Sequence, residues 1–212
     1  MPEMIETLRG LTAEIEARSA GKRLIVAVAG APGSGKSTLS DALLAELNSS
    51  RADRAALMAM DGYHFDNDIL RARNLMPRKG APETFNAEGM AADLDRIFQG
   101  IQDVAVPVFD RAADLARAHA RIVHKAARIV LVEGNYLLLD RDPWRAMARF
   151  FGLTIFLHVP EAELERRLIR RWLDLAHDED QANARAAGND MANARLVIAQ
   201  SRKADIGVTL AG

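Results

Sequence analysis

The stretch Leu24-Ile-Val-Ala-Val-Ala-Gly-Ala-Pro-Gly-Ser-Gly-Lys-Ser-Thr-Leu39 decides the fold of this chain. Its first six residues, 24–29, are all apolar, which is typical of a strand that is buried on both faces of a sheet. Residues 30–37 follow the pattern G-x-x-x-x-G-K-[ST], and apolar residues recur at helical spacing directly after them. The stretch therefore predicts a strand, a glycine-rich loop and a helix in immediate succession.

The residue types of this loop suit a bound triphosphate. Glycines let the backbone turn tightly so that its N–H groups surround an anion, and the following helix presents its N-terminal N–H groups to the same anion. Lys36 adds a charge for the β- and γ-phosphates, and the Ser37 hydroxyl suits Mg²⁺. A glycine-rich turn with a surface lysine is the alternative, but both flanks match a P-loop. We therefore predict that ATP and Mg²⁺ bind here, at Gly30, Ala31, Pro32, Gly33, Ser34, Gly35, Lys36, Ser37 and Thr38.

The composition fits one α/β domain over residues 1–212, with apolar residues at 49% and charged residues at 27%. The net charge of −1 predicts no nucleic-acid partner. The chain has no cysteine, which excludes a disulfide scaffold, a thiolate metal site and a cysteine nucleophile. No apolar leader or membrane-spanning run is visible, so we expect a cytoplasmic protein without membrane insertion. Formation of a homo-oligomer is left open.

Asp61 follows a second apolar segment, Ala55-Ala-Leu-Met-Ala-Met60, which we expect to be a short buried strand. Ligands of open parallel α/β sheets bind beyond the carboxyl ends of the strands, so an acid at this place is a candidate catalytic group. The aspartate also precedes Gly62, and an ordinary turn is the alternative. We predict that Asp61 is catalytic and lies near the Mg²⁺.

Glu133 follows the segment Arg128-Ile-Val-Leu-Val132, which indicates another buried strand. A hydrophobic strand that ends in an acid is typical of the Walker B pattern, whose carboxylate reaches the Mg²⁺ side of a nucleotide site. The pattern gains weight from the glycine-rich loop upstream. We predict that Glu133 and Ser37 contribute to the metal site.

The connection 66–87 is long, and loops of this length tend to be functional. Its basic residues include Arg78 and Lys79, and it also contains the aromatic Phe85. These side chains could form one wall of an acceptor pocket, whereas a solvated charged loop is the alternative.

A second candidate wall begins with the extended segment Val104–Phe109, in which Pro107 favours an edge strand or a segment outside any sheet. The chain then continues to Arg111 and Asp114, whose opposite charges could hydrogen-bond the hydroxyl groups of a small polar substrate.

A basic helix is expected over residues 161–176. It carries four arginines: Arg166, Arg167, Arg170 and Arg171. Arg167 and Arg170 are three residues apart and therefore share one face. One interpretation is a solvated basic face paired with nearby glutamates. The other is a lid, over about residues 161–190, whose guanidinium groups lie over a transferring phosphoryl group.

Two expectations concern strands of the C-terminal third of the chain. Leu153–Val159 reads as a buried strand, and we expect His158 within it to be a packed core residue. A helix over Met191–Ser201 is expected to lead to a final strand, Ala204–Leu210.

In the order of its motifs, the chain resembles the uridine kinase, pantothenate kinase and phosphoribulokinase group of P-loop kinases, and within it the fructose transport system kinases. The resemblance covers nearly the whole chain, and its motifs are GAPGSGKST, MDGYHFDN, KGAPETF, PVFDR, VEGNYLLLD, ERRLIRR and NDMANARLVIAQSRKAD. It implies a three-layer α/β fold, with a five-stranded parallel sheet between helices and an arginine-bearing lid.

The resemblance also implies roles for single residues. Asp61 stands at the position of the general base, and Arg167 and Arg170 stand at lid arginine positions, so the predicted catalytic set is Asp61, Lys36, Arg167 and Arg170. Asp114 stands where nucleoside kinases carry a pocket histidine, which disfavours uridine or cytidine as the acceptor. The predicted acceptor pocket contains Tyr63, His64, Phe85, Phe109, Arg111 and Asp114.

Together these features predict an ATP-dependent kinase of a small hydroxylated metabolite, with a sugar such as fructose favoured. Pantothenate or a nucleoside as the acceptor is a first alternative. A switch that hydrolyses ATP and signals to a transporter is a second, although a switch needs no acceptor pocket. A nucleic-acid-linked ATPase is disfavoured because no basic stripe is present.

Overall fold

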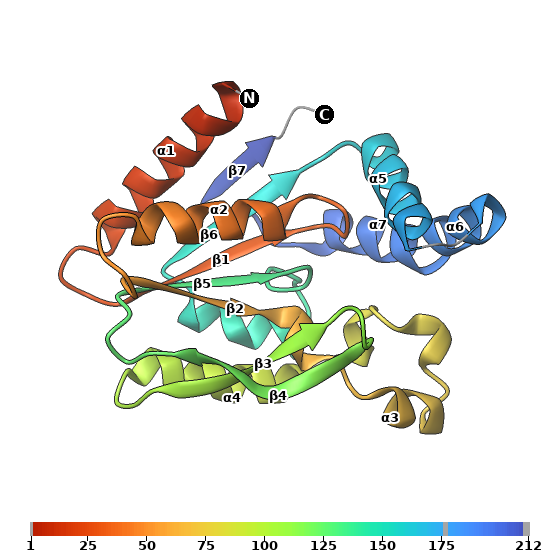
Figure 1. Ribbon diagram of the computed structural model, residues 1–212, viewed down its shortest axis with the longest axis horizontal. Helices are drawn as coiled ribbons and strands as arrows, with labels where there is room; N and C mark the ends of the chain where they lie inside the picture. The colour runs from red at the N-terminus through yellow and green to blue at the C-terminus, as the bar shows by residue number, and fades with distance from the viewer. Residues whose placement is uncertain (1, 176–177, 210–212) are drawn as a thin grey trace.

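The computed structural model describes residues 2–175 and 178–209, with side chains from residue 5 onward. Five parallel strands form the central sheet in the order β2-β5-β1-β6-β7 (Figure 1). Their bounds are β1 (Leu24–Gly30), β2 (Ala55–Ala59), β5 (Ile129–Gly134), β6 (Leu153–His158) and β7 (Ile206–Thr209). The predicted five-stranded parallel sheet is confirmed, and β1, which leads into the glycine-rich loop, is its central strand.

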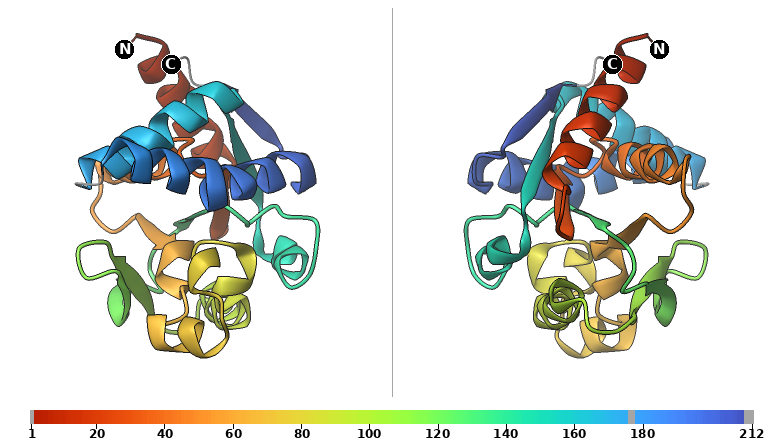
Figure 2. Two further views of the ribbon diagram at one scale, coloured as in Figure 1. Left: turned by 90° about the vertical axis from the view of Figure 1, so that its right-hand side faces the viewer. Right: turned by 90° about the vertical axis from the view of Figure 1, so that its left-hand side faces the viewer.

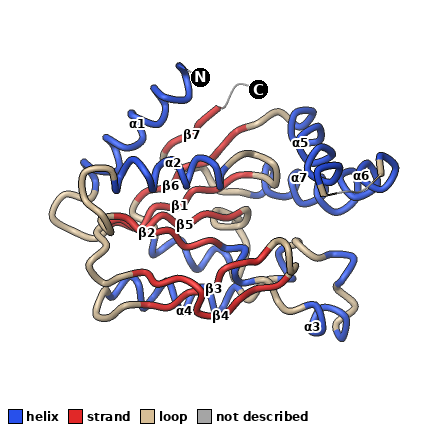
Figure 3. The backbone as a smooth tube through the Cα atoms, viewed as in Figure 1, coloured by secondary structure: helices blue, strands red, loops and turns tan. Residues whose placement is uncertain are grey.

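Helices cover both faces of this sheet (Figures 1 and 3). Their bounds are α1 (Pro2–Arg18), α2 (Lys36–Asn48), α3 (Asn67–Ala72), α4 (Ala87–Gln99), α5 (Glu161–Asp174), α6 (Glu179–Arg185) and α7 (Met191–Gln200). Figure 2 shows α5, α6 and α7 together beside the sheet. Within the described residues, no helix combines the length and the apolar character that crossing a membrane requires.

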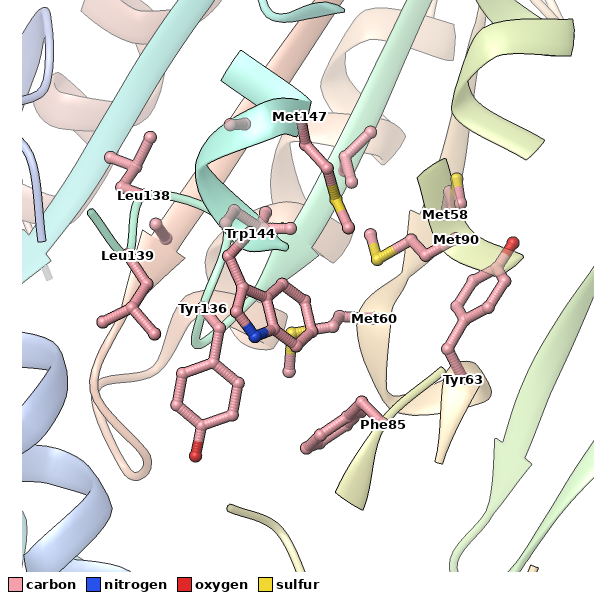
Figure 4. Packing of buried hydrophobic residues seen from close by; sticks show 14 of the residues in the cluster. Met58, Met60, Tyr63, Phe85, Met90, Tyr136, Leu138, Leu139, Trp144 and Met147 are labelled. Atoms are coloured by element: carbon pink, nitrogen blue, oxygen red, sulfur yellow. The ribbon is translucent and has the colours of Figure 1, made fainter. Parts of the chain in front are cut away.

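Two cores form because successive side chains of a strand point to opposite faces. On one face, Val26 and Val28 of β1 pack with buried leucines of α2 and with Leu11 and Ile15 of α1. On the other face, the alternate residues of β1 pack with α4, α5, α7 and the short helix Trp144–Phe150. Figure 4 shows part of this second core, where the rings of Tyr136 and Trp144 lie side by side.

An antiparallel hairpin of β3 (Val104–Asp110) and β4 (Leu115–Val123) lies outside the central sheet. The sequence did not predict β4, and β3 is a true strand. Pro107 lies where the register shifts, because Val106 faces Arg121 while Val108 faces Arg117. Proline lacks the N–H that a regular ladder needs, so its place at this irregularity is the physical reason that β3 can still pair.

The long connection 66–87 contains α3 and two short 3-10 helices, Met76–Arg78 and Pro82–Thr84, rather than an unstructured loop. The Asp66 carboxylate accepts a hydrogen bond from the Asp68 N–H and so caps α3. Asn86 caps α4 in the same way by accepting from the Gly89 N–H. These short polar caps fix where the two helices begin, and α4 in addition buries an apolar face of Met90, Leu94 and Ile97.

The expectation for His158 was wrong, because its side chain is exposed at the end of β6. His158 pairs with Thr209 of the edge strand β7, and its ring lies beside Gly207, which has no side chain to cover it. The expected lid includes Ala176 and His177, and the expected final strand includes Leu210. These three residues, like 1, 211 and 212 of the expected domain, lie outside the described residues.

Arg23, just before β1, forms hydrogen bonds to the end of α4 and to the connection between β4 and β5, at the amino ends of the strands. Its guanidinium group donates to the backbone carbonyl of Ile97 at 2.5 Å, at the end of α4. It also donates to three carbonyls between β4 and β5, those of His124, Lys125 and Ala127. The base of the hairpin is thereby tied to the base of the sheet, opposite the carboxyl ends where ligands of such sheets bind.

Candidate active site

The loop between β1 and α2 has the geometry of an anion-binding turn. Gly33 and Gly35 have φ of +80° and +88°, a region that glycine adopts without strain. Gly30 is required for space, because a Cβ there would lie 2.6 Å from Ser34 Oγ. The helix α2 begins at Lys36, so its first N–H groups have no partner within the helix. These features fit a phosphate group at the loop.

Two further observations support this fit. The hydroxyl of Ser34 is buried and finds no hydrogen-bond partner among the described residues. A Cβ on Gly33 would lie 3.2 Å from Leu168 Cγ, so α5 packs directly against the loop. The lid helix expected from the sequence therefore lies beside the glycine-rich loop, where a triphosphate would need its charges.

Lys36 interacts through its charge with two carboxylates. One is Glu133 at the end of β5, and the other is Asp61 just after the adjacent strand β2. Burial lowers the pKa of the Lys36 ammonium group, and both carboxylates oppose that shift. Burial likewise raises the pKa of Glu133, against the opposing charge of Lys36. The hydroxyl of Ser37 donates to Glu133 Oε2 at 2.8 Å. Four predicted residues are thus brought together at one end of the sheet.

This group resembles the site of a hard cation only in part. No cluster of three or more His, Cys, Asp or Glu side chains able to hold a metal occurs among the described residues. Mg²⁺ is commonly held by one or two carboxylates together with substrate phosphates and water. A hydroxyl and two nearby carboxylates therefore fit a metal ion that arrives with a nucleotide.

Gly62 and Gly134 set the position of the two carboxylates. A Cβ on Gly62 would lie 2.5 Å from the carbonyl oxygen of Pro107, so the hairpin sits directly on the turn that carries Asp61. A Cβ on Gly134 would lie 2.5 Å from Met60 Cβ, beside Asp61. Because both approaches involve backbone or Cβ atoms, a side chain at either glycine would displace Asp61.

Asp61 is bound on its outer side by the hairpin turn. Arg111 Nη2 lies 3.2 Å from Asp61 Oδ2, and the arginine side chain is 64% exposed. Such an exposed ion pair is weak and easily exchanged for another partner. The carboxylate of Asp61 is thus held in place but remains available to a ligand in the cleft.

The aromatic part of the acceptor wall consists of three rings in contact. The centroid of the His64 ring lies 4.0 Å from that of Phe85 and 4.8 Å from that of Phe109. His64 Nδ1 lies 2.8 Å from the carbonyl oxygen of Asp61, which can only accept, so this nitrogen carries the hydrogen. Burial lowers the pKa of His64, which favours the neutral ring with Nε2 as an acceptor.

The charged part of the same wall is an ion pair between Lys79 and Asp114, with 2.7 Å between Nζ and Oδ2. Lys79 also donates to Asn67 Oδ1 at 2.7 Å and to the Asp114 carbonyl at 2.9 Å. Partial burial would raise the pKa of Asp114, but hydrogen bonds from Lys79 and Asn67 lower it below its usual value. The three donor positions of the ammonium group are therefore occupied.

The lid arginines differ in their partners. Arg167 donates to Glu163 at 2.5 Å and is largely covered, whereas Arg170 pairs with Asp174 and is 73% exposed. Arg171 instead binds Asp190, with 3.3 Å between Nη2 and Oδ2. The charge of Arg171 also lowers the pKa of Lys36, although burial is the main cause of that shift. All three arginines line the cleft described next.

These parts line one cleft of about 1090 Å³. It extends from Pro32 of the glycine-rich loop to the acceptor wall, and α5 and α6 contribute its other side. Among the predicted site residues, those that line it are Pro32, Asp61, His64, Phe85, Phe109, Arg111, Asp114, Arg167 and Arg170. Lys36, Ser37 and Glu133 lie behind this lining, joined to it through the charges described above.

Tyr63 is placed elsewhere. Its side chain is buried, and its hydroxyl donates to Asp93 Oδ2 at 2.8 Å, on α4. It does not line the cleft. Of the basic residues in the connection 66–87, Lys79 lines the cleft whereas Arg78 pairs with Glu83 outside it.

Several polar residues of the lining are absent from the predicted site, among them Asn135, Arg171, Asn189 and Asp190. Asn135 lies two residues after Glu133, so its position beyond the end of an acidic strand could have predicted that it lines the site. Asn189 and Asp190 lie at the end of the short wide helical turn Ala186–Asp190, far from the other residues in sequence. Only the packing of this turn against α5 brings them to the site.

The fold and the site define a class of protein. A central parallel strand that leads through a glycine-rich loop into a helix, with acids at the ends of two neighbouring strands, is the arrangement of a P-loop protein.

Comparison with known proteins narrows this class. A family model described as an AAA domain matches residues 26–185, and the chain belongs to this P-loop family. The structure of a Silicibacter sp. TM1040 protein, provisionally named a fructose transport system kinase, is 44% identical with a TM-score of 0.86; the match covers 95% of this chain and 98% of that one.

Two curated relatives match at similar breadth. The protein YggC of Escherichia coli is 35% identical over 87% of this chain and 77% of its own length. A provisionally named uridine kinase of Schizosaccharomyces pombe is 33% identical over 83% of this chain and 78% of its own length. Pantothenate kinases match as well, and the chain spans about half of their length. The protein is accordingly a P-loop kinase, and its family implies nucleotide binding.

Proposed function

We propose that the protein transfers the γ-phosphoryl group of ATP to a hydroxyl group of a small metabolite, with a sugar such as fructose as the favoured acceptor. The observation that carries this proposal is the position of Asp61. Its carboxylate lies in the cleft, between the half-buried Lys36 on one side and the ring wall of His64 and Phe109 on the other. An acceptor hydroxyl beside Asp61 would face a phosphate held at the glycine-rich loop.

The residues divide the reaction between them. Asp61 accepts the proton as the hydroxyl oxygen forms its bond to the γ-phosphorus, and the bond from that phosphorus to the β–γ bridging oxygen breaks to leave ADP. Lys36 and the loop N–H groups hold the β- and γ-phosphates, and lid arginines stabilise charge on the transferring group. Mg²⁺, held by Ser37 and Glu133, supplies further neutralisation of phosphate charge. Transfer needs little beyond such positioning and electrostatics.

The choice of acceptor rests on the walls of the cleft. Flat rings at His64, Phe85 and Phe109 suit the apolar face of a sugar, and the polar groups beside them suit its hydroxyls. The provisional name of the Silicibacter relative supports fructose as the first candidate. Pantothenate and uridine remain the alternatives, in line with the names of other relatives. We place the reaction in the cytoplasm, where ATP and Mg²⁺ are abundant.

The test is detection of a phosphorylated product by mass spectrometry. Purified protein with ATP and Mg²⁺ would be offered fructose, other sugars, pantothenate and uridine in separate reactions. We expect a sugar phosphate that disappears with Asp61→Asn. A phosphorylated product from pantothenate or uridine alone would replace the sugar, and slow ATP hydrolysis unaffected by every acceptor would favour the transporter-linked switch instead.

A further inference from the structure

The turn Ala186–Asp190 connects α6 to α7 by a wide helical turn with an irregular backbone at Gly188. Wide turns of this kind inside helices often lie at functional sites. Its last two residues, Asn189 and Asp190, both line the cleft. Their side chains point to different partners, one on each side of the cleft.

Asp190 holds the lid side. Its Oδ2 accepts from Trp172 Nε1 at 2.7 Å and from Arg171 Nη2 at 3.3 Å. The Asp190 side chain is only 14% exposed, whereas Asp174, the partner of Arg170, is 61% exposed. Arg171 is 40% exposed and Arg170 is 73% exposed, so water screens the Asp190–Arg171 pair less than the Asp174–Arg170 pair. The hydrogen bond from Trp172 also fixes the carboxylate that binds Arg171.

Trp172 strengthens this arrangement. The guanidinium carbon of Arg171 lies 5.1 Å from the centroid of the Trp172 ring, and that of Arg185, from α6, lies 4.8 Å away. Cations at these distances are attracted to the indole face. Arg171 is thus held by an aspartate and by a ring that donates to the same aspartate, in the cleft that Pro32 of the glycine-rich loop also lines.

Asn189 holds the acceptor side. Its Nδ2 donates to the Lys79 carbonyl oxygen at 2.8 Å. The next carbonyl, of Gly80, accepts from the Tyr136 hydroxyl at 2.6 Å. Gly80 has a φ of +97°, which glycine adopts without strain, and the backbone turns here between these two hydrogen bonds. The Lys79 side chain on this backbone carries the ion pair with Asp114 described above.

We propose that Asn189 and Asp190 form a positioning unit that joins the two sides of the cleft, with Asp190 aiming Arg171 at the γ-phosphate and Asn189 holding the Lys79–Gly80 backbone opposite. The proposal rests on the proposed function, because it assumes a nucleoside triphosphate at the loop. Arg171 contacts the phosphate, and the two residues of the turn act through their partners. Nucleotide binding at one side of the cleft therefore steadies the acceptor wall at the other.

The first test compares adenylyl imidodiphosphate, a non-hydrolysable ATP analogue, with ADP by isothermal titration calorimetry in the presence of Mg²⁺. We expect Asp190→Asn to raise the dissociation constant of the analogue about tenfold, the size of a lost charge-assisted hydrogen bond, and to leave ADP unchanged. A merely structural defect would weaken both ligands, because it would not distinguish the γ-phosphate.

A double-mutant cycle assigns the effect to Arg171. If Asp190 acts through Arg171, Asp190→Asn adds nothing in the background of Arg171→Ala. The matched control is Asp142→Asn, which breaks an exposed Asp–Arg pair with Arg145 outside the cleft and should leave both dissociation constants unchanged. Arg171→Ala alone tests the phosphate contact should Asp190→Asn fail to fold.

The second test measures hydrogen exchange in a peptide that spans residues 76–82. The analogue with Mg²⁺ should slow exchange there in the wild type but not in Asn189→Ala. Asn183→Ala, which removes a bond from Asn183 to the Glu179 carbonyl on the exposed face of α6, is the control and should behave like the wild type.

The outcomes separate this proposal from the proposed function. Equal affinity for the analogue in the wild type, Asp190→Asn and Arg171→Ala would overturn the role of Asp190 and leave the kinase assignment intact. Unchanged protection in Asn189→Ala would overturn the role of Asn189 in the same way. Failure of the wild type to bind either nucleotide would overturn both proposals.

Discussion

The phosphate end and the acceptor end of the cleft are built by different means. At the phosphate end, one short stretch of sequence supplies the glycine-rich loop, Lys36 and Ser37, and Ser37 donates to Glu133 at the end of β5. At the acceptor end, the hairpin, the connection 66–87 and the turn after α6 each contribute side chains, held by ion pairs such as Asp61–Arg111. The first end is set by backbone geometry and burial, the second by contacts between distant segments.

This difference has a consequence for function. A site that depends on backbone geometry is fixed by local sequence and serves one kind of ligand, here a phosphate chain. A wall assembled from exposed side chains can change its ligand through a few substitutions without loss of the fold. We therefore expect nucleotide binding to tolerate changes at the acceptor end, and the predictions below test how far the two ends are independent.

The largest effect is expected for Asp61→Asn, which removes the proton acceptor but keeps the shape of the side chain. Turnover should fall about 10²- to 10⁴-fold, the usual contribution of a general base. The dissociation constant for adenylyl imidodiphosphate should stay nearly unchanged in calorimetry, because the phosphate end is intact. A parallel loss of nucleotide affinity would show that the two ends are not separable at this residue.

A smaller effect is expected at the acceptor wall from Asp114→Asn, which weakens the ion pair with Lys79. For the acceptor that the product assay identifies, KM should rise about tenfold, as for loss of a charge-assisted hydrogen bond, with nucleotide affinity unchanged. Steady-state kinetics with either substrate varied would show this. Asp103→Asn, at the base of the same hairpin, is the control. An unchanged KM would remove Asp114 from the acceptor wall.

The pH dependence of nucleotide affinity tests the phosphate end separately from the acceptor end. Burial raises the pKa of Glu133, with Lys36 opposing. A protonated carboxyl cannot bind a cation, so affinity for the analogue with Mg²⁺ should fall as the pH is lowered through this raised pKa. Calorimetry over a pH series would measure it, and Glu133→Gln should bind weakly with a flatter profile. A wild-type profile as flat as that of the variant would contradict the role of Glu133.

For the free protein, the same raised pKa predicts the opposite pH dependence, namely that of the free energy of unfolding. Because the pKa of Glu133 is higher in the folded than in the unfolded state, its contribution to stability is present below the unfolded pKa and is lost as the pH rises through the folded pKa. Lowering the pH therefore favours the free protein at this residue while it disfavours the complex with Mg²⁺ and nucleotide.

The smallest kinetic effect is expected for Tyr63→Phe. The variant loses the hydrogen bond to Asp93, so the free energy of unfolding should fall by about 1 kcal/mol in urea denaturation. Its kinetic constants should stay close to those of the wild type, since the ring faces the core (Figure 4). A large rise in the acceptor KM would instead return Tyr63 to the pocket that the sequence predicted.

The same two ends explain what could be predicted from sequence. The loop, its strand and its helix follow local rules of apolar runs, glycine conformation and helix starts, so they were found directly. The hairpin was not found, because β4 consists mostly of alanine and charged residues without an apolar run. Membership in the kinase class came from motif order, and the five-stranded sheet was confirmed.

The arginines of the lid helix α5 show most clearly what could not be predicted from the sequence. Spacing placed Arg167 and Arg170 on one face, but spacing says nothing about which acid binds each arginine. Only the packing of the turn Ala186–Asp190 against α5 shows that Arg171, not Arg170, has a shielded partner. The roles of the arginines, the metal ligands and any homo-oligomer stay predictions.

The four carbonyls bound by Arg23 couple the acceptor wall to the core of the protein. They join the end of α4 and the base of the hairpin to the start of the central strand. A hairpin at the rim of a molecule would ordinarily open more readily than the core, but opening of this one at its base also breaks hydrogen bonds from Arg23. The segment that contacts the acceptor is thus anchored at one end, although its tip lies in water.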